Sequence, residues 1–265
     1  MSKKRAFIYG TIYVDDPQKA ELTQMWIELN QHLNPDFDIL IVDSQSNKSW
    51  LGLIPAMQGV PIHTVAEGDQ MPPLQRGVNW IDFPENMGHL NFNNLDGWGR
   101  AFCRGIDYAI QHDYEYAVNI ETDMLFGVPV SDVLGQMDAH KLNIISTDMK
   151  YTPFSHNYME NAIVFMRTSY MRQVDFVKKY DWRAQDKNAP GFEIPEQRCR
   201  TLLEPEVFYK HWNGIRRLAG AEDLKDENKI KDLVYMMHAE DQEYNYYFMR
   251  RYMPPGWQPP SWRRS

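Results

Sequence analysis

The segment from Arg5 to Asp43 reads RAFIYGTIYVDDPQKAELTQMWIELNQHLNPDFDILIVD, and it decides the fold class of the chain. Its first ten residues are rich in β-branched and aromatic side chains, which is typical of a β-strand. Asp16 and Pro17 then suit the cap and the first turn of a helix, and apolar residues recur along one face of that helix. A second apolar run ends at Asp43. A strand, a helix and a strand in this order predict a parallel sheet with a right-handed crossover.

The same patterns predict further α/β elements along the rest of the chain. Strands are expected at residues 78–83, 116–120, 142–149 and 160–167, and helices at residues 96–113, 169–180 and 241–252. Proline-rich segments at residues 51–75 and from residue 184 onward are expected to be irregular. The charged segment from Ala219 to Lys231 is expected to be a mobile lid. We expect residues 1–265 to form a single domain.

The composition narrows the class of protein and the classes of partner. The chain has 265 residues, 43% of them hydrophobic, so it can bury a sizeable core. A net charge of −8 argues against general nucleic-acid binding, which needs a basic surface. Two cysteines indicate a reducing compartment, and no apolar run approaches the length of a membrane span or of a signal-peptide core. These features predict a cytoplasmic protein without a transmembrane segment.

An acidic pair interrupts an apolar stretch in the middle of the chain. Residues 116–126 read YAVNIETDMLF, so Glu121, Thr122 and Asp123 directly follow a predicted strand. Ligands of open α/β sheets bind outside the carboxyl ends of the strands. Carboxylate oxygens there suit Mg²⁺ or Mn²⁺ that carries substrate phosphates. The alternative interpretation is a surface turn whose acids cap the next segment.

The residues around this pair resemble a known enzyme family. Glu85–Gly88 reads ENMG, Arg100 and Arg104 lie in a helix that reads RAFCRGI, and a strand then ends in the acidic pair. This arrangement resembles the GT-A glycosyltransferases, above all their large inverting family, over residues 5–126 and again over residues 238–251. The resemblance implies a Rossmann-like three-layer sandwich with a mostly parallel central sheet. It also implies a nucleotide-binding half at residues 1–126 and an acceptor-binding half at residues 127–265.

The resemblance implies a divalent cation, Mn²⁺ or Mg²⁺, at the acidic pair. The cation would offset the charge that develops on the diphosphate leaving group of a nucleotide sugar. Asp123 is the expected direct ligand, and Glu121, which is one methylene longer, is expected to bind through water or to contact the ribose. His211 lies in KHWNG, similar to a metal-binding element of some retaining relatives, but it precedes the Asp-Gln motif that such elements follow. A packed histidine is the alternative interpretation.

Several residues are candidates for the donor nucleotide. Asp43 closes a strand where family members hold the base or ribose, although a strand-end cap explains it equally well. Tyr9, Gly10 and Thr11 would flank the base, because glycine permits close backbone approach, or they are ordinary strand residues. Thr122, between the two acids, is assigned to the same site.

Three residues of the predicted helix at 96–113 complete the candidate set. Arg100 and Arg104 lie four positions apart, so they share one helix face and would meet the diphosphate. A solvated face is the alternative. Trp98, beside two glycines, is a candidate platform for stacking of the acceptor sugar.

A second informative stretch, residues 238–251, reads HAEDQEYNYYFMRR. Glu240 and Asp241 resemble the acidic pair that supplies the general base of inverting enzymes, with Asp241 deprotonating the acceptor hydroxyl. A carboxylate at a helix start is also a good cap. Asp241 with Gln242 is similar, too, to the Asp-Gln motif with which retaining enzymes bind sugar hydroxyls.

The expected function is a metal-dependent glycosyltransferase. It would move a sugar from a nucleoside diphosphate donor to a hydroxyl of a glycan or glycoconjugate, with inversion favoured over retention. A sugar-phosphate nucleotidyltransferase is the rival enzyme, although the Gly-rich basic loop typical of that class is missing after the first strand. An inactive carbohydrate-binding homologue is the rival without catalysis.

Overall fold

The computed structural model describes the main body of the chain. The described residues are 4–66, 68–88, 96–147, 159, 161–184, 192–203, 207–210, 214–215, 235–237 and 242–259. Within these ranges no helix combines the length and the apolar character that crossing a membrane requires.

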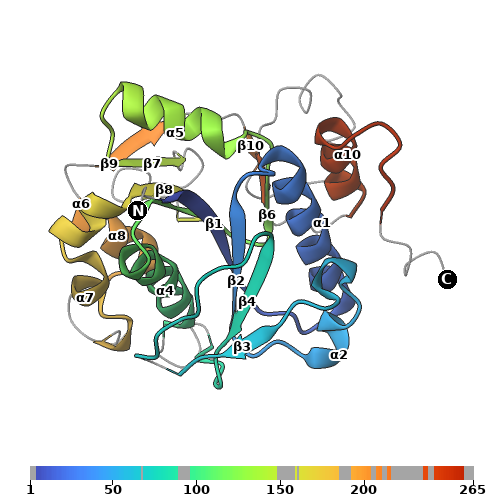
Figure 1. The fold of residues 1–265 in the computed structure, drawn as a ribbon, viewed down its shortest axis with the longest axis horizontal. Helices are drawn as coiled ribbons and strands as arrows, with labels where there is room; N and C mark the ends of the chain where they lie inside the picture. Colours follow the sequence, from blue (N-terminus) through green and yellow to red (C-terminus); the bar gives the residue numbers. More distant parts are fainter. Residues whose placement is uncertain are drawn as a thin grey trace.

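An eight-stranded sheet forms the centre of the described structure, in the order β3-β4-β2-β1-β5-β8-β7-β9 (Figure 1). Its strands are β1 Lys4–Ile12, β2 Asp38–Asp43, β3 Ile62–Thr64, β4 Val78–Asp82, β5 Tyr114–Ile120, β7 Ile144–Thr147, β8 Ile163–Arg167 and β9 Val207–Lys210. The first five strands of the order are mutually parallel. β8 runs antiparallel to both of its neighbours, and β9 is parallel to β7. The predicted α/β class with a mostly parallel sheet is therefore confirmed.

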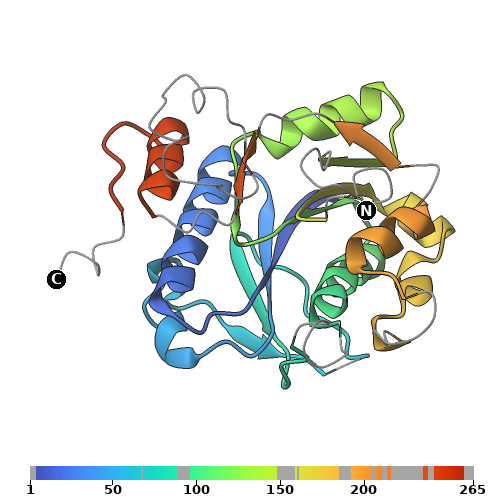
Figure 2. The same cartoon turned by 180° about the vertical axis from the view of Figure 1, so that it is seen from behind.

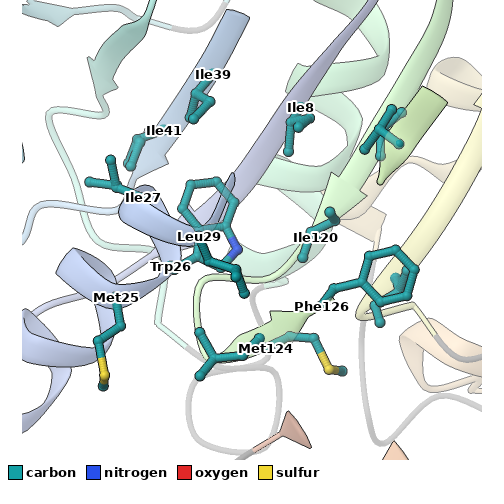
Figure 3. Close-up of a cluster of buried hydrophobic side chains, with 14 of the residues drawn as sticks. Ile8, Met25, Trp26, Ile27, Leu29, Ile39, Ile41, Ile120, Met124 and Phe126 are labelled. Carbon is teal, nitrogen blue, oxygen red and sulfur yellow. The ribbon is translucent and has the colours of Figure 1, made fainter. Parts of the chain in front are cut away.

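Two long helices cover opposite faces of this sheet, as Figures 1 and 2 show. α1 (Pro17–Leu33) begins at Asp16, whose side chain accepts a hydrogen bond from the Lys19 amide at 2.8 Å, as the sequence predicts. Its Trp26 belongs to a core that includes alternate residues of β1 and β2 (Figure 3). α4 (Gly97–Gln111) contributes Phe102 to a second core with the intervening residues of those strands. Helix, sheet and helix make three layers.

A small three-stranded sheet flanks the main one. It has the order β10-β11-β6, with β6 Met124–Phe126, β10 Gly214–Ile215 and β11 Tyr235–Met237. α10 (Gln242–Tyr252), which the sequence predicts, lies beside α1. The Tyr246 hydroxyl donates to Glu21 of α1, and the indole of Trp257 donates to Glu28 at 2.8 Å. These two hydrogen bonds link α10 and the segment after it to α1.

The other described elements correct three predictions. Residues 51–75 hold the 3-10 turn η1 (Pro55–Met57) and β3, and the region after residue 184 holds α8 (Pro195–Leu203) and β9. β3 is a short exposed edge strand and carries no alternation, and proline is tolerated at the first position of α8. The predicted helix at 169–180 is two helices, because Asp175 takes a left-handed φ of 55° between them. The remaining elements are α2 Lys48–Leu51, α5 Val130–Ala139, α6 Thr168–Gln173, α7 Phe176–Tyr180 and the 3-10 turn η2 Trp182–Ala184.

Candidate functional site

The carboxyl ends of β1, β2, β4 and β5 meet at one edge of the main sheet. The strand register aligns Ile12 with Asp43, and Asp43 with Asp82. The Thr122 hydroxyl, just after β5, donates to the carbonyl of Thr11 at 2.7 Å. Four chain segments that are distant in sequence therefore bring their polar residues to the same edge.

The acidic pair lies in a tight turn at this edge. The amide of Glu121 donates to the carbonyl of Ala162 at 2.8 Å, and the carbonyl of Glu121 accepts from Met124 at 2.9 Å. The turn sends the chain from β5 into β6. Thr122 is buried, whereas Glu121 and Asp123 are half-buried. The predicted strand ending in two acids is confirmed, and the fixed backbone places both carboxylates at the edge.

Trp98 in the first turn of α4 contacts this acidic pair. Its indole nitrogen donates a hydrogen bond to Oε1 of Glu121. Its ring stacks on Phe102, with 4.7 Å between the ring centroids and 17° between the planes. One face of the indole is thus covered by the protein, and its polar atom is committed to the first acid.

The ENMG segment shapes the loop that leads to α4. The Asn86 side chain accepts a hydrogen bond from the Gly88 amide at 2.6 Å, and Gly88 has a φ of 69°, which favours glycine. A Cβ at Gly97 would lie only 2.5 Å from the Gly88 carbonyl oxygen. Two glycines therefore let the loop pack against the start of the helix.

The two arginines of α4 are buried, so the solvated-face alternative is wrong. Arg100 donates to the carbonyl of Glu85 at 2.7 Å and lies 3.9 Å from the Phe83 ring centroid. Burial lowers its pKa to about 10, which leaves it charged at neutral pH. Arg104 donates to the carbonyl of Asp69, and burial lowers its pKa too. The arginines hold two different loops, and of the two only Arg100 contacts the loop at the site.

Asp43 is a strand-end cap inside the protein. It is fully buried. Oδ1 accepts from the amide and the hydroxyl of Ser46, at 2.9 and 2.5 Å, and Oδ2 accepts from the indole of Trp80 at 3.2 Å. Burial raises its pKa to about 6, although the Ser46 hydrogen bonds oppose this shift. The prediction that its side chain contacts a nucleotide is corrected, because no face of it is accessible.

Tyr9 and Gly10 also belong to the core. Tyr9 is fully buried, and its hydroxyl donates to the carbonyl of Phe102 at 3.2 Å. A Cβ at Gly10 would lie 2.7 Å from the Ile120 carbonyl oxygen, so this glycine serves strand packing. Their predicted contact with the base is therefore corrected to the packing alternative. Thr11 is half-buried and lies at the edge, so its role stays a prediction.

Two groups at the edge were missed from the sequence. Tyr13 directly follows β1 and is 43% exposed, with the amino group of Lys19 5.6 Å from its ring centroid. Asp82 closes β4 and pairs with the exposed Lys48 at 2.7 Å. The signal for Asp82 was available, because an acid closes its strand as Asp43 closes β2. Nothing in the sequence separates Tyr13 from the buried aromatic residues before it.

Three predicted residues, His211, Glu240 and Asp241, lie outside the described residues, and so does the predicted lid. The described chain on either side of Glu240 and Asp241 is informative. Met237 of β11 pairs with Met124, the residue after Asp123, and α10 begins at Gln242. Four residues therefore connect a strand that flanks the acidic turn to the start of this helix.

No protein-family model and no curated protein sequence matches the chain. Solved structures do match. The glycosyltransferase GlyE of Streptococcus pneumoniae TIGR4 has a TM-score of 0.56 at 10% identity, over 94% of this chain and 60% of GlyE. The galactosyltransferase LgtC, solved with donor and acceptor sugar analogues, has a TM-score of 0.54 at 12% identity, over 97% of this chain and 99% of LgtC.

These likenesses concern the fold, because identity this low says nothing about the reaction. The chain spans about three fifths of the length of GlyE and nearly all of LgtC. The protein therefore has the GT-A fold of the nucleotide-sugar glycosyltransferases.

Proposed function

We propose that the protein is a metal-dependent glycosyltransferase of the cytoplasm. It transfers a sugar from a nucleoside diphosphate sugar to a hydroxyl group of a glycan or glycoconjugate, with inversion at the anomeric carbon. The observation that carries this proposal is the turn of Glu121 and Asp123. It offers two half-buried carboxylates at the carboxyl edge of a GT-A sheet, in contact with the first turn of α4.

The donor set at this turn fits a hard divalent cation. Carboxylate oxygens are the ligands that Mg²⁺ and Mn²⁺ prefer. Within the described ranges no group of three or more His, Cys, Asp or Glu side chains is arranged to hold a metal. At the turn, one or two carboxylates would hold the cation, and substrate phosphates and water would complete its shell. The bound cation would offset the charge of the diphosphate leaving group.

The residues around the turn would hold the donor. The accessible ring of Tyr13 would stack on the nucleobase, an interaction that tolerates any base. The carbonyl of Thr11 accepts the hydrogen bond of Thr122 in the turn, and the charged Arg100 adds positive potential at the start of α4. The nucleotide would thus run from the end of β1 towards the end of β5.

Asp241 is proposed as the general base, with Glu240 beside it. The acceptor oxygen attacks the anomeric carbon while its proton passes to the Asp241 carboxylate. The bond from the anomeric carbon to the diphosphate oxygen breaks, and the nucleoside diphosphate leaves with the electron pair. The pairing of β11 with β6 supports this role, because it brings the preceding strand alongside the acidic turn.

Nucleotide binding by the Asp123→Asn variant tests the proposal. Calorimetry should show that wild type binds a nucleoside diphosphate with Mn²⁺ and that the variant binds it at least about 10-fold more weakly, because a charged ligand is lost. Asp132→Asn, an exposed aspartate of α5, is the matched control and should bind as wild type. Equal affinity of Asp123→Asn and wild type would exclude this metal site.

Product analysis tests the reaction itself. The proposal predicts a glycosylated acceptor whose anomeric configuration, determined by NMR, is inverted relative to that of the donor. A retained configuration would instead assign Asp241 to sugar binding. Formation of a nucleotide sugar from a sugar phosphate and a nucleoside triphosphate would identify a nucleotidyltransferase.

A further inference from the structure

The hydrogen bond between Trp98 and Glu121 joins two elements of the site. The donor is an indole in the first turn of α4, and the acceptor is a carboxylate just after β5. A hydrogen bond to an ionised acceptor is roughly twice as strong as one between neutral groups. Both residues are half-buried, which limits the competition from water. The contact therefore restrains the carboxylate strongly.

The length of the glutamate side chain is matched to this contact. The backbone of Glu121 is fixed on both sides, by its bonds to Ala162 and Met124. The reach of the carboxylate is then set by the side chain alone. Aspartate is shorter by one carbon–carbon bond, about 1.5 Å, so it would fall short of the indole.

The indole is itself held rigidly. It stacks on Phe102, which is fully buried and packs edge-on against Phe176 at 6.1 Å. Glycines lie on both sides of it, and a Cβ on Gly99 would overlap the Asp96 carboxylate and the Tyr180 ring. The start of α4 therefore packs closely against its surroundings, and Trp98 is a fixed donor.

We propose that Trp98 is a positioning residue for the acidic turn. It holds the Glu121 carboxylate in one orientation, so that Asp123 acts as the direct metal ligand and Glu121 as its oriented neighbour. This inference rests on the proposed function. The role of Trp98 as a platform for the acceptor sugar stays a prediction, because Phe102 covers one face of the ring and a sugar would stack on the other.

The hydrogen bond can be followed by NMR of the full ¹⁵N-labelled chain. Trp98→Phe identifies the Trp98 indole N–H signal among the eight tryptophans by its loss. Glu121→Gln should move that signal upfield and speed its exchange with water, because the charged acceptor is gone. An unchanged signal would overturn the proposal, and this measurement needs neither metal nor substrate.

The positioning role is tested by calorimetry with Mn²⁺ and a nucleoside diphosphate. Trp98→Phe keeps an aromatic ring on Phe102 but removes the donor, and it should weaken binding roughly 10-fold. Trp257→Phe, which removes a similar bond to Glu28 far from the edge, is the matched control and should bind as wild type. Glu121→Asp should weaken binding in wild type and add little in Trp98→Phe.

The outcomes separate this inference from the proposed function. If wild type binds the nucleoside diphosphate and Trp98→Phe binds it equally well, the inference fails alone. If wild type binds no nucleoside diphosphate with any divalent metal, both fail. Additive effects of Glu121→Asp and Trp98→Phe also overturn the inference. If Trp98→Phe does not fold, the indole signal is assigned in the wild-type protein by triple-resonance NMR, and its response to Glu121→Gln decides the inference.

Discussion

At the scale of single residues, burial separates the structural acids at the strand ends from the accessible ones. Asp43 and Asp82 end neighbouring strands in register, and both are buried. Asp43 accepts from three groups of its own chain, and Asp82 pairs with Lys48 and the amide of Gln45. Glu121 and Asp123 directly follow β5, which lies two places from β2 in the sheet, and both are half-buried. An acidic residue at the end of a strand is therefore a buried cap at β2 and a candidate metal ligand after β5.

Asp43 should make the stability of the protein depend on pH. Its folded-state pKa of about 6 lies above the ordinary value of 3.8. The folded state therefore binds the proton more tightly, and the stabilisation present below about pH 4 is lost as the pH rises through 6. Two pKa units correspond to on the order of 2–3 kcal/mol. Urea denaturation at several pH values between 4 and 7 measures this decline.

The Asp43→Asn variant isolates this contribution. Its amide rearranges the hydrogen bonds to Ser46 and Trp80, so absolute stability should fall at every pH. The informative quantity is the slope between pH 4 and 6, which should be less negative than in wild type. Parallel curves for the two proteins would show that Asp43 keeps an ordinary pKa.

At the scale of elements, the contact between α4 and β1 depends on a missing side chain. Tyr9 of β1 packs over Gly105 of α4, where a Cβ would overlap its ring. Gly135 of α5 is the opposite case, since a Cβ there would meet nothing within 4 Å. Gly105 faces a buried ring and Gly135 faces open space. Substitution by alanine should therefore change the stability in opposite directions at the two positions.

We expect Gly105→Ala to lower the free energy of unfolding by about 1–3 kcal/mol, because the methyl group overpacks the core. Gly135→Ala should raise it by about 0.5–1 kcal/mol, because alanine favours the helix. Chemical denaturation measures both. A Gly105→Ala variant as stable as Gly135→Ala would mean that α4 and β1 do not pack this closely.

Capped and periodic elements are the ones that the sequence predicts. α1 follows from Asp16 and Pro17, and β5 follows from an apolar run that ends in two acids. β3 and α8 were missed because three exposed residues and a helix that starts at a proline carry no clear period. The carboxyl edge of the sheet could be predicted because the strands that end there have clear apolar patterns. The contacts of Asp43, Tyr9 and Trp98 could not, because they join segments that are distant in sequence.

At the scale of the whole molecule, the two edges of the main sheet differ in chemistry. The carboxyl edge holds the candidate site. Near the opposite edge, Asp138 of α5 accepts hydrogen bonds from Tyr116, from Arg5 at 2.8 Å and from Arg167 at 3.2 Å. These bonds, from Tyr116 first and Arg5 next, lower the pKa of Asp138 to about 2. This cluster ties β1, β5, β8 and α5 together away from the site.

Asp138→Asn should therefore change stability and leave nucleotide binding unchanged. The folded pKa lies below 3.8, so the charged pairing stabilises the protein above about pH 4 and is lost as the pH falls through 2. The effect should be no more than about 1 kcal/mol, because Asp138 is 40% exposed and water screens it. Thermal unfolding at pH 7 and pH 3 and calorimetry with nucleotide check both parts. Weakened nucleotide binding would mean that the two edges are coupled.

The pairing of β6 with β11 also sets the order in which a growing chain can be completed. β1, β2, β4 and β5 all lie within residues 4–120, whereas residues 127–234 separate Phe126 from its partner Tyr235. β1 and β5 also pair across a long separation, from Lys4 to Tyr114, so the entropy of loop closure does not order the two contacts, and the order of synthesis does. During synthesis, residues 4–120, which hold these four strands, are complete before the residues of β11. β11, which pairs with β6 just after the turn of Glu121 and Asp123, follows every strand of the main sheet in the chain. A chain truncated before residue 235 would therefore carry the main sheet with an unbraced acidic turn.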